Sequence, residues 1–120
     1  YGTRHIIEAM NEKGYEIKEI YMCGGHTKNQ LFVQEHADIT GCDIYLPQEK
    51  EAVLLGTAML AAVAAGKYRS VMEAMTNMSN IGERFRPNFN HQKQHNTRYK
   101  IFKLLYEQYK EIQAISNESV

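Results

Sequence analysis

The sequence lacks an excess of charge of either sign. Its 14 Lys and Arg residues balance 14 Asp and Glu residues, so the formal net charge at pH 7 is zero. Binding to nucleic acid or to an anionic membrane surface depends on clustered positive charge. The basic segment 91–100 is followed by acidic residues and is typical of a solvated helix face. We therefore expect neither nucleic acid nor a membrane as a partner.

Cysteine and long apolar runs are also scarce. The two cysteines, Cys23 and Cys42, are too few for a disulfide framework, which favours a reducing, cytoplasmic compartment. We expect both to be small buried side chains. The longest apolar stretch, 52–65, is interrupted by Gly56 and Thr57 and is shorter than the roughly 20 residues of a membrane-spanning helix. No basic segment followed by an apolar core opens the chain, so we expect no signal peptide.

Hydrophobic periodicity predicts an α/β chain that is rich in helices and has two short strands. Ile6, Ile7 and Met10 share one helical face, and Gly14 ends that helix. Pro87 makes the segment 84–90 irregular. The predicted strands cover 17–23 and 42–47, and the later helices cover 28–40, 51–65, the region around 71–75, and 91–114.

Two of these elements need neighbours that the chain does not supply. The strand at 17–23 has a continuous apolar run typical of a strand buried on both faces. The helix at 51–65 is apolar nearly all round, which is typical of a helix buried on most sides. A two-stranded sheet alone is marginal in water. We therefore expect the chain to be a piece of a longer protein, or to complete its sheet by pairing with another chain.

The first predicted strand ends in Gly24-Gly25, directly before a helix. Adjacent glycines adopt unusual backbone angles and have no Cβ to block close approach, and a helix start presents free N–H groups. Such a turn suits an anionic or flat ligand such as a nucleotide, although it is also a common structural turn. Neither the G-K-[ST] end of a Walker loop nor G-x-G-x-x-G is present.

The residues around this turn resemble the ATP-binding part of the FGGY carbohydrate kinases. The family pattern is a strand, Gly-Gly, Asn, a helix with Q-x-x-A-D, a Gly, a strand ending at Pro, and E-x-x-x-L-G-x-A. The chain is closest to the pentulose-kinase branch, near ribulose kinases. It carries the matching residues in the same order without gaps: Gly24, Gly25, Asn29, Gln34, Ala37, Asp38, Gly41, Pro47, Glu51, Leu55, Gly56 and Ala58.

The resemblance implies an actin-like ATPase (ribonuclease H-like) fold, with residues 1–120 as part of the C-terminal nucleotide-binding domain. The parent would phosphorylate a ketopentose such as ribulose, or a related polyol, with Mg²⁺ and ATP. Gly24 and Gly25 would lie against the adenosine and α-phosphate, and Asn29 at the adenine. His26 would pack on the ribose or base, or point to solvent.

The family's catalytic Asp and its sugar-binding residues have no counterpart in this sequence. The sugar would therefore be bound through an N-terminal domain outside the chain, and we expect the chain alone to be inactive. The alternative is a truncated, non-catalytic module that senses a nucleotide or binds a protein. For such a module, an unpaired strand makes homo-oligomerisation an expectation.

Two further groups of residues suggest sites but have simpler explanations. His91 and His95 have the i, i+4 spacing of a zinc chelate, but no third ligand is evident, so we do not expect a metal there. Gln34, Ala37 and Asp38 are interpreted as scaffold, with Asp38 hydrogen-bonded locally near the end of its helix.

Overall fold

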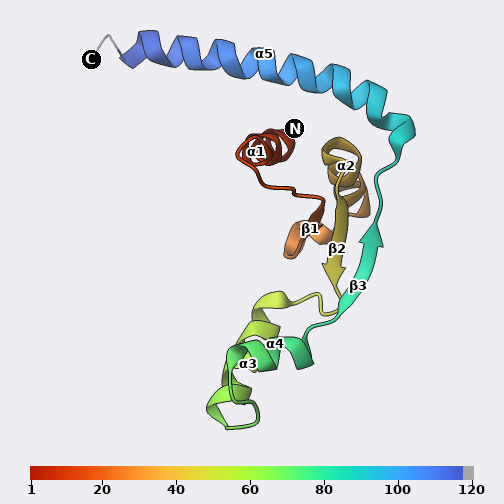
Figure 1. Cartoon of the computed structure of the whole chain (residues 1–120), viewed down its shortest axis with the longest axis vertical. Coiled ribbons are helices and arrows are strands. Elements are labelled where there is room, and N and C mark those ends of the chain that lie inside the picture. Colours follow the sequence, from red (N-terminus) through yellow and green to blue (C-terminus); the bar gives the residue numbers. More distant parts are fainter. Residues whose placement is uncertain (118–120) are drawn as a thin grey trace.

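A computed structural model describes residues 1–117 of the chain, and it contains ten regular elements (Figure 1). The third strand was not predicted, whereas the other strands and the helices lie close to their expected positions. The elements in order are α1 (Gly2–Asn11), β1 (Glu19–Tyr21), the 3-10 helix η1 (Gly25–Lys28), α2 (Gln30–Thr40), β2 (Asp43–Pro47), α3 (Ala52–Ala64), α4 (Val71–Met78), β3 (Ile81–Phe85), the 3-10 helix η2 (Phe89–His91) and α5 (Gln92–Asn117).

The sheet has the order β1-β2-β3, with β1 parallel and β3 antiparallel to β2. The unpredicted β3 has apolar residues only at its ends and is mostly exposed, so its sequence lacks the pattern of a buried strand. Gly82 allows it to lie close to the chain that follows β2. A Cβ at Gly82 would be only 2.9 Å from Cα of Gln48.

The expectation that the first strand is buried on both faces is wrong for this chain. β1 lies at the edge of the described sheet, only three residues long, and Tyr21 is 67% exposed. The residues between 1 and 117 provide no strand for its free edge. β2 is the central strand instead, with Ile44 and Leu46 buried.

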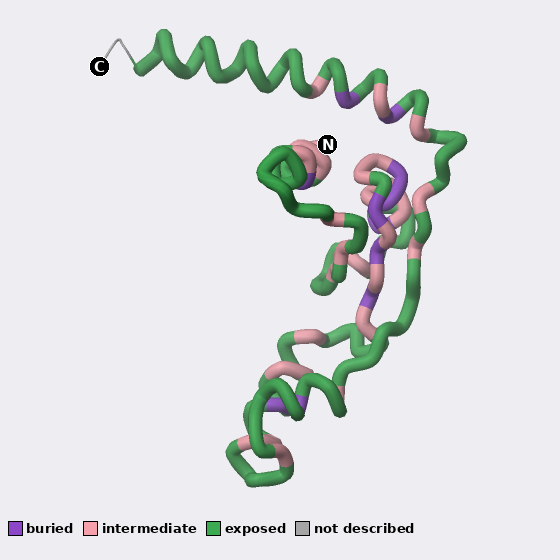
Figure 2. The backbone as a smooth tube through the Cα atoms, viewed as in Figure 1, coloured by how far each residue is buried: buried purple, intermediate pink, exposed green. Residues whose placement is uncertain are grey.

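The core lies between α2 and the sheet, where Figure 2 shows buried residues on both α2 and β2. Val33 and Ala37 of α2 pack against Ile44 and Leu46 of β2. Asn29 caps the start of α2, and Gly41 ends it in the left-handed conformation. β1, α2 and β2 thus form a βαβ unit, and this unit positions the Gly24-Gly25 turn.

The expectation that the 51–65 helix is buried on most sides is also wrong. α3 packs against α4, and Met59 is its buried residue, whereas Val53 is 83% exposed. Figure 1 shows this helical pair extending away from the sheet. The radius of gyration of 19.2 Å exceeds the roughly 14 Å of a compact domain of this length. Much of the apolar surface of α3 therefore has no cover from the described chain.

α5 is anchored at its first turns and extends past α1 beyond them (Figure 1). Tyr99 is buried against α1, but Leu104, Leu105 and Tyr109 are exposed. The apolar side chains of this helix are therefore covered only at its beginning. No helix within residues 1–117 combines the length and the hydropathy needed to cross a bilayer.

Candidate nucleotide site at the Gly24-Gly25 turn

The turn after β1 has a backbone conformation that only glycine adopts readily. Gly24 has φ +105° and ψ 178°, a region that strains residues with a Cβ. Its carbonyl oxygen accepts hydrogen bonds from Thr27 N at 3.1 Å and from Thr27 Oγ1 at 2.7 Å. These bonds close η1, so Gly24 has a structural role that is independent of any ligand.

Gly25 differs from its neighbour because nothing within the described chain requires a glycine there. Its φ angle is not positive, and a Cβ placed on it would meet no heavy atom within 4 Å. The turn lies beyond the carboxyl end of β1, which is where α/β sheets bind their ligands. The open space beside Gly25 therefore allows a ligand to approach the backbone closely.

Asn29 caps α2, because its Oδ1 accepts a hydrogen bond from Phe32 N at 3.2 Å. This structural role leaves the Nδ2 group as the part of the amide that can donate to a ligand. The exposed His26 ring makes an edge contact with Phe32, with 5.5 Å between ring centroids. Both side chains therefore lie at the start of α2, beside the turn.

Two hollows adjoin the residues on either side of the turn, but neither is lined by Gly24 or Gly25. The smaller has a volume of about 280 Å³ and a mixed polar lining that includes Thr27, Lys28 and Lys50. The larger is an apolar groove of about 690 Å³ between β1, β2, α3 and α4. Cys23, directly before the turn, lines the groove and is exposed, so the expectation that it is buried is wrong. Cys42 is buried as expected, and burial raises the pKa of its thiol.

Asp38 lies near the other end of α2 and joins it to distant parts of the chain. Its Oδ1 accepts hydrogen bonds from Gln34 Nε2 at 2.7 Å and from Asn88 N at 2.8 Å, and its Oδ2 lies 3.0 Å from His91 Nδ1. Burial raises the pKa of this carboxyl, but these three hydrogen bonds outweigh burial and lower the pKa overall. The scaffold interpretation is supported, although the bonds are not only local.

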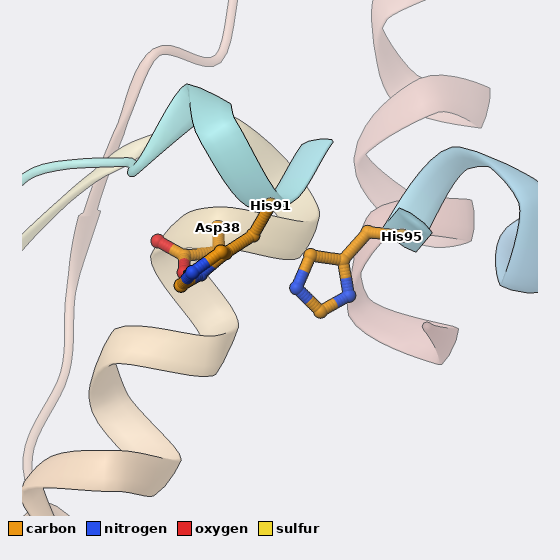
Figure 3. A group of neighbouring side chains, drawn as sticks. All are labelled: Asp38, His91 and His95. Carbon is orange, nitrogen blue, oxygen red and sulfur yellow. The ribbon is translucent and has the colours of Figure 1, made fainter. Parts of the chain in front are cut away.

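Sequence reasoning missed one grouping of side chains. The structure places Asp38 beside His91 and His95 (Figure 3), although 53 residues separate Asp38 from His91. A third ligand for the two histidines is therefore present. Their i, i+4 spacing was the available signal, but only the docking of α5 on α2 brings the carboxylate to them.

Known proteins similar to this chain are sugar kinases and their relatives. Residues 1–65 match the sequence profile of the FGGY family of carbohydrate kinases, C-terminal domain. The human FGGY carbohydrate kinase domain-containing protein is 48% identical over 98% of this chain and 21% of its own length. The ribulokinase of Geobacillus thermodenitrificans is 44% identical over 72% of this chain and 16% of its own length.

Solved structures show the same fold. The xylulose kinase of Rhodospirillum rubrum superposes with a TM-score of 0.69 at 19% identity, over 92% of this chain and 22% of that protein. The gluconate kinase of Lactobacillus acidophilus gives a TM-score of 0.61 at 24% identity, over 80% of this chain and 19% of that protein. The chain spans about a fifth of the length of these relatives. It belongs to the FGGY family of carbohydrate kinases and has the α/β fold of part of their actin-like ATPase domain.

Proposed function

We propose that this chain is the adenosine-binding part of a kinase that transfers the γ-phosphoryl group of ATP to a hydroxyl of a ketopentose such as ribulose, or of a related polyol. Ribulokinases among its relatives support this substrate class. The observation that carries the proposal is the Gly24-Gly25 turn, where Gly25 is open to a ligand although its own backbone does not require glycine.

The turn can contribute to nucleotide binding in three ways. At Gly25 no Cβ prevents a flat base or sugar from lying on the backbone. The start of α2 adds the positive end of a helix dipole, which favours a phosphate nearby. Asn29 Nδ2 provides a donor, while its Oδ1 holds the helix start in place.

ATP would bring a Mg²⁺ ion that neutralises charge on the transferred phosphoryl group. Mg²⁺ prefers carboxylate and water oxygens, but near the turn Glu51 already pairs with Lys28 at 3.5 Å. The residues at the turn thus fit the nucleoside and not the ion, which would be held by ATP and by residues outside this chain. The same holds for the catalytic base, so the chain alone would be inactive.

Substitution of Gly25 by Val in the full-length protein tests the proposal. The new side chain would fill the space open to the ligand, so we expect the dissociation constant for ADP to rise at least about 10-fold by calorimetry. Gly2→Val is the matched control, because Gly2 also has no heavy atom within 4 Å of a Cβ but lies in α1. Unchanged ADP affinity in Gly25→Val would refute the site.

A second candidate function is a truncated, non-catalytic module that senses a nucleotide or binds another protein. The apolar groove of about 690 Å³ beside the exposed α3 favours it, since such a surface suits a partner. The two candidates differ in activity. Phosphorylation of ribulose by the protein at the length at which it is expressed would support the kinase, whereas ADP binding by it without phosphorylation of any ketopentose or polyol would support the module.

A further inference from the structure

Asp38, His91 and His95 form a side-chain cluster, here called the Asp38 cluster, at the junction of α2, η2 and α5. One ligand atom of each residue lies within 4.8 Å of the ligand atoms of the other two. Figure 3 shows the His95 ring directed toward Asp38 and His91. Asp38 and His95 are buried, whereas the His91 side chain is 54% exposed. The cluster therefore has two fixed members and one that faces solvent.

Two of the three side chains are oriented by partners outside the cluster. Gln34 and Asn88 both donate to Asp38 Oδ1, which leaves Oδ2 facing His91. His95 Nδ1 lies 3.2 Å from the Tyr1 hydroxyl, so its Nε2 is the nitrogen available to the cluster. Metal-binding carboxylates and histidines are usually held in this way through their second oxygen or nitrogen. A simple ion pair between Asp38 and His91 does not require such an orientation of His95.

The chemistry of the donors selects the class of metal. Two imidazole nitrogens and one carboxylate suit Zn²⁺, while Mg²⁺ and Ca²⁺ prefer oxygen ligands only. With bonds of about 2.0 to 2.1 Å, tetrahedral Zn²⁺ places its ligand atoms roughly 3.3 Å apart. Asp38 Oδ2 and His91 Nδ1 are already 3.0 Å apart. The ligand atoms of the three residues lie within 4.8 Å of one another, so the His91 and His95 rings need only a small shift to reach tetrahedral spacing. The exposed side chain of His91 has room for such a shift.

A fourth ligand is also within reach. Glu35 Oε2 lies 3.9 Å from His95 Nε2, and its side chain is partly exposed. Either this carboxylate or a water molecule can complete a tetrahedral shell. We propose that the Asp38 cluster binds Zn²⁺ and that the ion fixes the start of α5 and η2 to α2. This site is separate from the glycine turn, because Asn29 and Asp38 lie near opposite ends of α2.

The test uses the full-length protein after treatment with a chelator. Zn²⁺ is added at increasing concentrations, and its dissociation constant and the unfolding temperature are measured, with Mg²⁺ as the comparison ion. Because a ligand that binds only the folded state stabilises it, we expect Zn²⁺ and not Mg²⁺ to raise the unfolding temperature. Co²⁺ bound to two nitrogens and one oxygen should in addition give a visible absorption band.

His91→Gln is the main variant, because this side chain is exposed and its loss leaves the buried residues in place. We expect Zn²⁺ affinity to fall at least about 100-fold. Loss of a residue that only hydrogen-bonds to a metal ligand lowers affinity by about 10- to 100-fold, so a larger fall identifies His91 as a ligand itself. His36→Gln is the matched control, since His36 is on α2 but outside the cluster and bonds to Phe32 O. The proposal is overturned if Zn²⁺ leaves the wild-type unfolding temperature unchanged, or if His91→Gln binds Zn²⁺ as tightly as His36→Gln.

Discussion

Tyr99 of α5 donates its hydroxyl hydrogen to Glu8 Oε2 of α1 across a distance of 2.7 Å. The two residues are 91 positions apart, and Tyr99 is only 2% exposed. Arg4 lies on the same ring, with its guanidinium carbon 4.3 Å from the ring centroid, and also pairs with Glu8. This group of side chains is therefore a main connection between the beginning of the chain and α5.

Tyr99→Phe should lower the free energy of unfolding by about 1.5 to 3 kcal/mol, because it removes a hydrogen bond to a charged group. The ring would remain, so packing against Arg4 and Phe102 should persist. Urea unfolding of the full-length protein measures the change. Tyr106→Phe is the control, since the Tyr106 ring stacks on Phe102 in a more exposed part of α5. Equal losses in the two variants would contradict the role of the Glu8 bond.

The same contact predicts how stability depends on alkaline pH. Burial and the neighbouring Glu8 carboxylate raise the pKa of Tyr99 to about 12, from an ordinary value of 10.0. Because the folded state holds this proton more tightly, the stabilisation is complete below about pH 10 and is lost as the pH rises toward about 12. The ultraviolet titration of wild type minus that of Tyr99→Phe should show one late-ionising phenol. A difference centred near pH 10 would contradict this prediction.

The two glycines of the turn should respond differently to a small side chain. Gly24→Ala forces a Cβ into a region reserved for glycine and should cost about 1 to 3 kcal/mol of stability. Gly25→Ala should leave the stability nearly unchanged, because its backbone and surroundings accept a Cβ. Thermal unfolding of both variants without nucleotide compares them. A larger loss in Gly25→Ala than in Gly24→Ala would show that the two roles are assigned the wrong way round.

The uncovered surface of α3 predicts self-association of the chain 1–120 when it is produced alone. Val53 and Leu60 are both exposed on this helix, and an apolar patch of this kind promotes association in water. Sedimentation velocity should show a mass that increases with protein concentration, and Val53→Glu should reduce the increase. Thr57→Glu is a control on the same helix that removes no apolar side chain. A monomer at all concentrations would contradict the prediction.

The elements that sequence predicted best are those bounded by residues with a local effect on the backbone. Gly41 ends α2 and Pro47 ends β2. The bounds of both elements lie within two residues of those expected. β3 was missed because Gly82 and its charged neighbours are not typical of a strand. They are tolerated at an edge, where the close approach to Gln48 favours a glycine.

Burial was predicted less well, because it depends on what lies next to each element. The apolar residues of α3 indicate a helix that is stabilised by burial against other elements. The described chain buries only part of this helix. The Gly24-Gly25 turn was identified from its sequence, and its role in nucleotide binding stays a prediction. The Asp38 cluster depends on the docking of α5 against α2, so no local pattern could bring its third member to the two histidines.

Because α5 is anchored at one end only, a small rotation at that end moves its far end by a large distance. Its first turns are held by the bond from Tyr99 to Glu8, and η2, which directly precedes it, is held by the bond from His91 to Asp38, whereas its later part lies free of the sheet. A helix of 26 residues is roughly 39 Å long. A rotation of about 10° at the anchored end would therefore displace the far end by roughly 7 Å. A few side chains beside α2 thus determine where the distant turns of this helix can reach.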